Sequence, residues 1–359
     1  MYAPMLTESS TTFLKRLLDT PGPSGFESAP AKVWRDEAGT FAAVSQDVAG
    51  NSMAVVNPNG APTIMLAGHI DEIGLIVTYI DDEGFLYIGP IGGWDAQVLV
   101  GQRIRFLSRG ADVMGVIGKK PIHLIKPEDR KKASEMTDLW VDIGATSRED
   151  AEKRVSVGDA GVIDSRTVDF PNGLIASRSI DDRIGAFIVL EALRRYAEKP
   201  GAARVVAVAT TQEEIAYHGG GARVSATRIG PQMALVVDVT HATDYPGAEK
   251  KEHGEHKLGG GPVLTRGSII SPVVFTLLRD AAARLSIPFT LHAAGRESWT
   301  DADAIHVARE GVATGLISIP NRYMHSPNEV VSLEDLDRAS ALIAETCRAV
   351  SPETDFTAR

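Results

Sequence analysis

The stretch Ser179-Ile180-Asp181-Asp182-Arg183-Ile184-Gly185 joins a predicted strand to a predicted helix, and the predicted fold is organised around it. An apolar run at 174–176 precedes it, and residues 184–196 show the apolar spacing of a helix. Open α/β sheets bind ligands at such positions. Because neighbouring side chains of a strand point to opposite faces, we expect one of Asp181 and Asp182 to carry chemistry and the other to point outward or be structural. Taken alone, the pair could simply cap the helix.

On both sides of this stretch, predicted strands alternate with predicted helices. Continuous apolar runs at 63–69, 205–210 and 233–237 are typical of strands buried on both faces of a sheet. A further strand is predicted at 314–319, and helices are predicted at 8–18, 28–37, 271–285 and 332–350. We therefore predict an α/β fold with a mostly parallel sheet flanked by helices, formed by residues 1–72 and 166–359.

The segment between these two parts has a different pattern. Short predicted strands at 75–79, 85–88, 102–107, 113–117 and 161–163 are separated by glycines and turn sequences. This pattern predicts an inserted all-β domain of residues 73–165, either a small barrel or a sandwich.

Composition excludes several classes of function. The formal net charge of −10 offers no basic surface for nucleic acid or for an anionic membrane. No apolar run is long enough to span a bilayer, and the N-terminus lacks the pattern of a secretory signal. Cys347 is the only cysteine, so a disulfide framework and a thiolate metal site are both excluded. We expect a cytoplasmic protein whose metal ions, if any, are held by histidines and carboxylates.

Ionisable residues recur at the ends of the predicted buried strands, which meet along one edge of a parallel sheet. Two histidines and several carboxylates without a cysteine form a donor set that suits zinc, cobalt or manganese. The residues are His69, Asp71, Asp181, Asp182, Glu213, Glu214 and Asp238, together with His325 in the loop after the strand at 314–319.

The number of donors indicates two ions rather than one, because a pair of metals needs one bridging carboxylate and terminal ligands on each ion. Asp181 as the bridge, His69 with Asp238 on one ion, and His325 with Glu214 on the other complete that set. Asp71 could accept the second ring N–H of His69, which leaves Glu213 as a free general base.

Each of these residues also has a simpler explanation. A histidine at a strand end is often only a satisfied polar group. Glu213 and Glu214 could form the acidic first turn of a helix, and Asp238 could form a turn with Thr240.

Five segments, in order along the chain, resemble one family: the dinuclear metallo-aminopeptidases that assemble as tetrahedral dodecamers. That family includes glutamyl, lysyl and leucyl (deblocking) aminopeptidases. The segments are 68–74 (GHIDEIG), 179–185 (SIDDRIG), 211–215 (TQEEI), 237–241 (VDVTH) and 323–327 (YMHSP). The match runs from the first predicted helix to the last.

The resemblance implies a zinc-peptidase-like fold in which the β insert is a dimerisation domain. It implies a metal-dependent aminopeptidase with two divalent ions per chain, acting on short peptides and assembling as a dimer or a dodecamer. Carried over by residue, it implies His69, Asp181, Glu214, Asp238 and His325 as ligands, Glu213 as general base, Asp71 as a supporting residue, and a cis bond between Asp181 and Asp182. The bulky Trp299 stands where small residues are common in the family, which leaves the substrate preference open.

Two other functions remain open at this stage. Some relatives have been labelled endoglucanases, although glycosidases normally use two carboxylates without a metal. The second alternative is a catalytically inactive scaffold or binding protein that has kept the fold.

Overall fold

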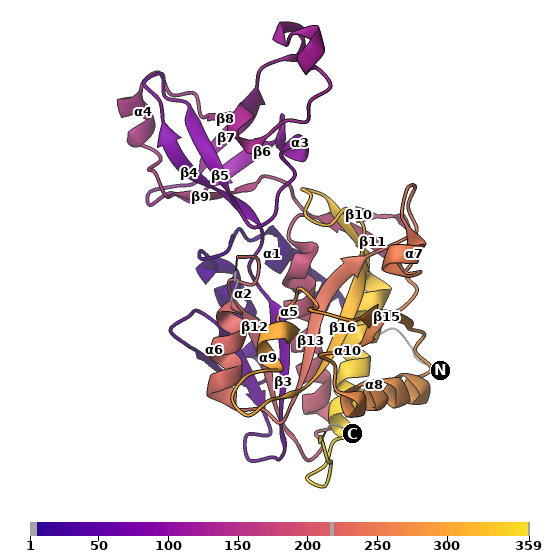
Figure 1. Cartoon of the computed structure of the whole chain (residues 1–359). Coiled ribbons are helices and arrows are strands. Elements are labelled where there is room, and N and C mark those ends of the chain that lie inside the picture. Colours follow the sequence, from indigo (N-terminus) through magenta and orange to yellow (C-terminus); the bar gives the residue numbers. More distant parts are fainter. Residues whose placement is uncertain (1–5, 216–218, 358–359) are drawn as a thin grey trace.

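A computed structural model describes residues 6–215 and 219–357. Two parts are distinct in it (Figure 1): a layered α/β body, and a small barrel that stands beyond one end of the body. The barrel strands come from the middle of the chain, between the third and the tenth strand.

The central sheet is mixed and, in the described residues, has eight strands in the order β1-β2-β12-β3-β13-β16-β14-β15. Its four middle strands, β12, β3, β13 and β16, are parallel, as predicted. The pairs β1–β2, β2–β12 and β14–β16 are antiparallel. The strands are β1 (Ala43–Gln46), β2 (Ser52–Val56), β3 (Thr63–His69), β12 (Arg204–Thr210), β13 (Met233–His241), β14 (Val263–Gly267), β15 (Thr290–Ala294) and β16 (Ala313–Asn321).

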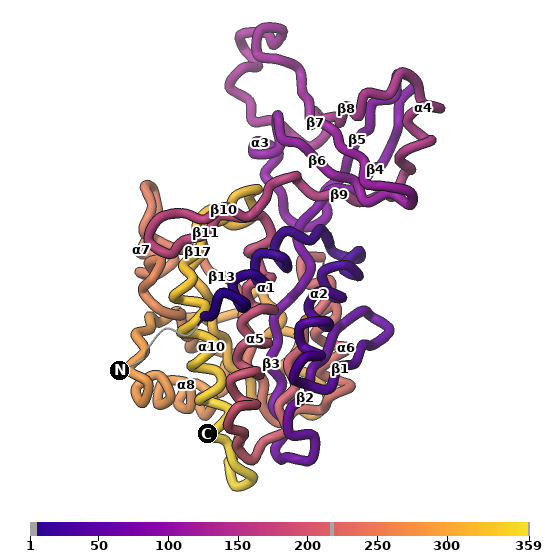
Figure 2. Tube along the Cα trace, turned by 180° about the vertical axis from the view of Figure 1, so that it is seen from behind, coloured from indigo at the N-terminus to yellow at the C-terminus, as the bar shows by residue number. Residues whose placement is uncertain are grey.

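Both faces of this sheet are covered, which explains why its central strands are continuously apolar. In β3, Ile64 and Leu66 pack into one apolar cluster, whereas Met65 and Ala67 pack into another. The first face is covered by five helices (Figure 2): α1 (Glu8–Asp19), α2 (Ser28–Ala38), α5 (Ile180–Glu198), α8 (Pro272–Leu285) and α10 (Leu333–Arg348). Helices α6 (Gly220–Ile229) and α9 (Ala302–Ile305) cover the second face.

The strands of the middle segment close into a barrel in the order β4-β5-β8-β7-β6-β9. Its apolar core is separate from the two clusters of the body. The strands are β4 (Gly74–Ile80), β5 (Leu86–Ile91), β6 (Arg103–Phe106), β7 (Val113–Lys119), β8 (Leu139–Asp142) and β9 (Ala160–Ile163). Of the two predicted architectures the barrel is found, but the segment also contains the short helices α3 (Ala96–Leu99) and α4 (Arg148–Glu152), so it is not purely β.

A small antiparallel sheet, β10-β11-β17, lies beside the start of α5. It consists of β10 (Val168–Phe170), β11 (Leu174–Ser177) and β17 (Glu329–Ser332), and the short helix α7 (Lys250–His253) completes the body. Among the described residues, no helix is long and apolar enough to cross a membrane.

Candidate metal centre

The start of α5 packs against the end of β3 at a distance that only glycine allows. A Cβ atom on Gly68 would lie 2.3 Å from the carbonyl carbon of Gly185. This contact places Asp181 and Asp182, at the beginning of α5, beside His69, the last residue of β3. The two glycines therefore explain locally why a strand end and a helix start share one site.

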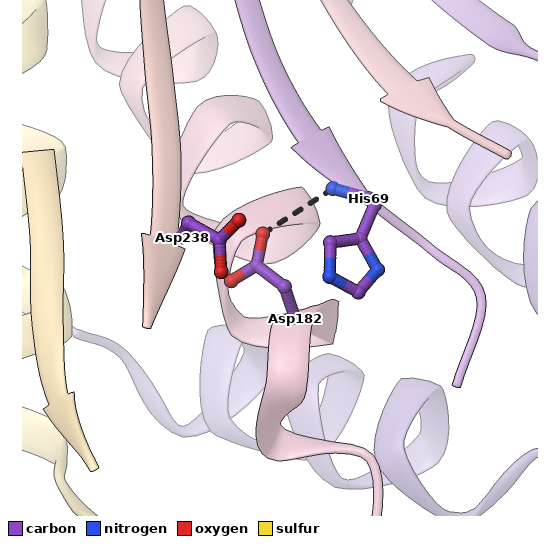
Figure 3. Close-up of side chains that lie close together, drawn as sticks. All are labelled: His69, Asp182 and Asp238. Carbon is purple, nitrogen blue, oxygen red and sulfur yellow. Dashed lines mark hydrogen bonds between the residues drawn. The ribbon is translucent and has the colours of Figure 1, made fainter. Parts of the chain in front are cut away.

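His69, Asp182 and Asp238 form a buried cluster (Figure 3), in which one potential ligand atom from each residue lies within 4.8 Å of the others. The backbone N–H of His69 donates to Asp182 Oδ2 at 3.2 Å. Asp238 belongs to β13, which runs parallel to β3. Val236 of β13 is paired with Ala67 of β3, and two residues further along each strand come Asp238 and His69. Adjacent parallel strands thus carry the imidazole and the Asp238 carboxylate to the same edge of the sheet.

The Asp181 carboxylate lies between two imidazoles. Its Oδ1 is 3.2 Å from Nε2 of His69, and its Oδ2 is 3.3 Å from Nε2 of His325. Oε2 of Glu214 is 3.4 Å from the same Nε2 atom of His325. One carboxylate therefore faces two separate nitrogen donors with its two oxygens, which is the arrangement expected of a bridging ligand.

Glu213 and Asp71 lie next to this cluster. Oε2 of Glu213 is 3.8 Å from Nε2 of His69. Asp71 Oδ1 is 3.4 Å from the other ring nitrogen of His69, Nδ1, where it can fix the tautomer of the ring. The carboxylate of Asp71 also accepts the backbone N–H groups of Glu213 and Glu214, both at 3.2 Å, and the hydroxyl of Ser24.

The structure brings all seven predicted site residues to one edge of the sheet: His69, Asp71, Asp181, Glu213, Glu214, Asp238 and His325. The peptide bond between Asp181 and Asp182 is cis. Asp182 does not point outward, because its side chain is buried and accepts N–H groups from His69 and Gly185. Both adjacent carboxylates therefore face the cluster.

Carboxylates outnumber imidazoles in the cluster, so their ionisation equilibria are shifted by burial and by one another. Burial, together with the charge of Asp181, raises the pKa of Asp238 well above its usual range, and burial does the same for Glu213. Asp181 behaves differently: burial opposes its ionisation, but the imidazoles of His325 and His69 hold its pKa below the usual range. Burial alone would lower the pKa of His325, yet the Asp181 and Glu214 carboxylates raise it to about 11.

These residues fit divalent cations. Within residues 6–215 and 219–357, Oε1 of Glu214 is buried without a hydrogen-bond partner. An unpaired buried oxygen is costly unless a ligand satisfies it. Imidazoles and carboxylates are suitable donors for zinc and its neighbours, and positive charge at this point would relieve the repulsion among the crowded carboxylates.

Sequence reasoning missed two further buried acids beside the cluster. Asp301 accepts the hydroxyl of Thr210, and burial raises its pKa to about 6. Glu329 accepts the backbone N–H groups of Asp181 and His325. A glutamate four residues after His325, at the start of the apolar run Val330-Val331, was the available signal for Glu329.

A cavity of about 960 Å³ opens beside the cluster and is large enough for an amino-acid side chain and the residues that follow it. Glu213, Glu214 and Asp238 line its inner end, and three histidines line one wall (His241, His253 and His292). Trp299, which is 86% exposed, lies at its rim.

A sheet with a parallel centre and buried imidazole and carboxylate donors at its edge are typical of α/β metal-dependent hydrolases. The profile of the M42 glutamyl aminopeptidase family matches residues 50–342. The lysyl aminopeptidase of Pyrococcus furiosus is 34% identical over 351 residues, which cover 96% of this chain and 98% of that protein. The chain belongs to the M42 glutamyl aminopeptidase family.

Solved structures of relatives agree with this assignment. The TET aminopeptidase from the marine sediment archaeon Thaumarchaeota archaeon SCGC AB-539-E09 has a TM-score of 0.91 and 36% identity, and the match covers 96% of this chain and 97% of that one. The Pyrococcus horikoshii TET1 peptidase, described as assembling into a tetrahedron or a large octahedral shell, has a TM-score of 0.84 and 29% identity, with 95% and 100% covered.

Proposed function

We infer that this protein is a metal-dependent aminopeptidase that removes N-terminal residues from short peptides. Membership of the M42 family supports the reaction class. The observation that carries the mechanism is the Asp181 carboxylate, whose two oxygens face the Nε2 atoms of His69 and His325 at 3.2 and 3.3 Å. Glu213 lies beside this arrangement and is not part of it.

We propose that the centre holds two divalent ions per chain, with zinc as the expected metal and cobalt or manganese as alternatives. His69 and Asp238 would bind one ion, His325 and Glu214 would bind the other, and Asp181 would be shared. When bound, the ions polarise the substrate carbonyl and lower the pKa of water. Asp71 holds the His69 ring and the backbone of Glu213 and Glu214 in place.

Glu213 is the proposed general base. Its carboxylate takes a proton from the attacking water, whose oxygen forms a bond to the carbonyl carbon of the first peptide unit. As the C–N bond breaks, Glu213 gives the proton to the departing nitrogen. Burial raises the pKa of Glu213 in the metal-free protein.

The barrel gives the basis for a proposal on assembly. We propose that residues 73–165 form a dimerisation domain inserted into a catalytic domain of residues 1–72 and 166–359, and that dimers build a dodecamer. The assemblies described for the Pyrococcus horikoshii relative support this proposal. The native mass of the full-length protein tests it directly. A cytoplasmic location remains a proposal that rests on the sequence alone.

Hydrolysis of a panel of aminoacyl-p-nitroanilides tests the function. Chelator-treated protein should be inactive, and reloading with zinc, cobalt or manganese should restore cleavage of free but not of N-acetylated substrates. Cleavage of a soluble β-glucan that survives the chelator would instead favour the endoglucanase alternative. Fewer than about one ion per chain and no hydrolysis of any substrate would favour an inactive scaffold.

A further inference from the structure

Glu329 is a buried carboxylate that no step of the proposed reaction uses. It is the first residue of β17 and is 2% exposed. The antiparallel register of β17 with β11 places it opposite Ser177, just before the start of α5. Glu329 therefore lies next to the start of α5, and it is not among the residues that line the cavity beside the metal centre.

Both oxygens of Glu329 accept N–H groups from proposed metal ligands. Oε2 accepts the backbone N–H of Asp181 at 3.0 Å, and Oε1 accepts the backbone N–H of His325 at 3.0 Å. The side-chain amide of Asn321 also donates to Oε1, at 3.3 Å. One side chain thus connects the shared ligand to the histidine that faces it, although the two are far apart in the sequence.

The contacts of Glu329 differ from those of the neighbouring buried glutamate, Glu72. Glu72 forms ion pairs with Arg178 and Arg183, as expected of a structural acid. In the described part of the chain, no lysine, arginine or histidine nitrogen lies within ion-pair distance of Glu329, whose partners are amide N–H groups. A carboxylate without a charged partner is an expensive group to bury, which points to a role beyond packing.

The loop that carries His325 needs such support. His325 has a φ of +57°, in the left-handed region that is unfavourable for residues with a Cβ atom. The loop is closed at its base by two backbone hydrogen bonds of 3.0 Å between Arg322 and Val330. Within the loop, the bond from the His325 N–H to Glu329 fixes the backbone from which the imidazole projects.

We propose that Glu329 is a positioning residue of the metal centre, which sets the separation between the Asp181 carboxylate and the His325 imidazole through the backbone of both. The proposal rests on the metal centre put forward under the proposed function. Asp71 provides a parallel, because its carboxylate accepts the backbone N–H groups of Glu213 and Glu214. Glu329 and Asp71 each accept two backbone N–H groups from residues that lie outside the strands of the central sheet.

The test is a cobalt titration of metal-free Glu329→Gln, followed by the visible absorption of the bound Co²⁺. Glutamine has the same shape but a single acceptor oxygen, so either the Asp181 or the His325 N–H faces an NH₂ group. We expect Co²⁺ affinity to fall about 10–100-fold, as for other residues that orient ligands, with an altered Co²⁺ spectrum.

Asp335→Asn is the matched control. Asp335 is also fully buried and accepts two backbone N–H groups, from Gly259 at 2.7 Å and Gly261 at 2.8 Å, but it contacts none of the proposed ligands. Both variants should unfold at a lower temperature than the wild type, and only Glu329→Gln should change affinity and spectrum. Glu329→Asp keeps two carboxylate oxygens on a shorter side chain and should lose less Co²⁺ affinity than Glu329→Gln. It takes the place of Glu329→Gln in the test if that variant does not fold.

The outcomes separate this proposal from the one on which it rests. Wild-type protein that binds no Co²⁺ in the titration would overturn the metal centre itself. If wild-type protein binds two ions and Glu329→Gln, or Glu329→Asp in its place, binds them with unchanged affinity and spectrum, the positioning role is wrong. The role is also wrong if Asp335→Asn loses affinity to the same extent, because the effect would then follow from lowered stability.

Discussion

The two halves of the proposed metal centre are built in different ways. In the half that contains His69 and Asp238, both residues belong to strands of the central sheet and are almost fully buried. In the half that contains His325 and Glu214, both residues lie in loops, and the side chain of His325 is 34% exposed. The strands of the sheet therefore carry the ligands of the first half. The second half depends on the buried acids that hold its loops and on the loop at 92–95 between β5 and α3, where Gly93 lies against His325.

Substitution of the residue shared by both halves should have the largest effect. Asp181→Asn removes the charge that faces both imidazoles while keeping the shape of the side chain. We expect the metal content to fall from about two ions per chain to below one, and hydrolysis to fall to the rate of the blank. Metal analysis by mass spectrometry with parallel p-nitroanilide assays measures both. Retention of two ions would show that Asp181 is not shared.

Glu213→Gln should separate chemistry from metal binding. Loss of a general base typically lowers the rate by about 10²–10⁴-fold, and we expect kcat to fall in that range while both ions remain bound. The measurement is kcat on a cobalt-loaded sample whose metal content has been determined. A kcat within a few-fold of the wild type would remove Glu213 from its proposed role.

Asp71→Asn tests a support that serves both halves, because Asp71 contacts the His69 ring and the backbone of Glu214. The amide can no longer accept both loop N–H groups and pairs less well with the His69 ring, so we expect metal affinity or activity to fall about 10–100-fold. Competition with a zinc-specific chelator measures the affinity. An unchanged affinity together with unchanged activity would contradict the role of Asp71.

Gly93→Ala tests the support of the second half from the barrel side. A Cβ atom on Gly93 would lie 3.1 Å from Nδ1 of His325, which is closer than ordinary contact. We expect a several-fold loss of affinity for one of the two ions and no change in the other. Gly110→Ala is the control, because a Cβ there meets no atom within 4 Å. An identical titration curve for both variants would show that the loop does not position His325.

The smallest predicted effect is on the number of protons released when metal binds. The pKa of His325, raised to about 11 by Asp181 and Glu214 against the effect of burial, keeps the metal-free imidazole protonated at pH 7. Its proton stabilises the metal-free fold most fully below the ordinary histidine pKa, and this contribution disappears as the pH rises through 11. Metal binding must displace the proton, so affinity should rise with pH.

Calorimetry of zinc binding in two buffers of different ionisation enthalpy counts the protons released. His325→Ala should release fewer protons per chain at metal saturation than the wild type, because the proton of its imidazole is absent. An equal number would show that His325 does not carry a displaceable proton.

The first half of the site was more accessible to prediction than the second. Apolar strands ending in polar residues placed His69 and Asp238 at one sheet edge, and the structure has them there. Asp182 was expected to point outward or to be structural, and it does not point outward. The rule of alternating side chains assumes a regular strand, whereas Asp181 and Asp182 form an irregular, non-helical start of α5. Glu329 was missed because its partners are backbone N–H groups of residues distant in the sequence, which no local pattern reveals.

Prediction of the fold was limited in the same way, by contacts between residues that are distant in the sequence. The long buried strands and most helices of the body were predicted, because their apolar periodicity is local, but helix α6 was not. The short strands β8, β14 and β17 were not, since each has four or five residues and is defined by a partner elsewhere in the chain. Closure of the middle segment into a barrel depends on the pairing of β6 with β9, which the sequence pattern alone does not specify.

Anomalous X-ray diffraction from zinc-loaded crystals tests the central claim most directly. The account predicts two anomalous peaks per chain, about 3.5–4 Å apart, with one Asp181 oxygen directed at each. One peak should have His69 and Asp238 as neighbours, and the other should have His325 and Glu214. A single peak, or two peaks that do not share Asp181, would contradict the account.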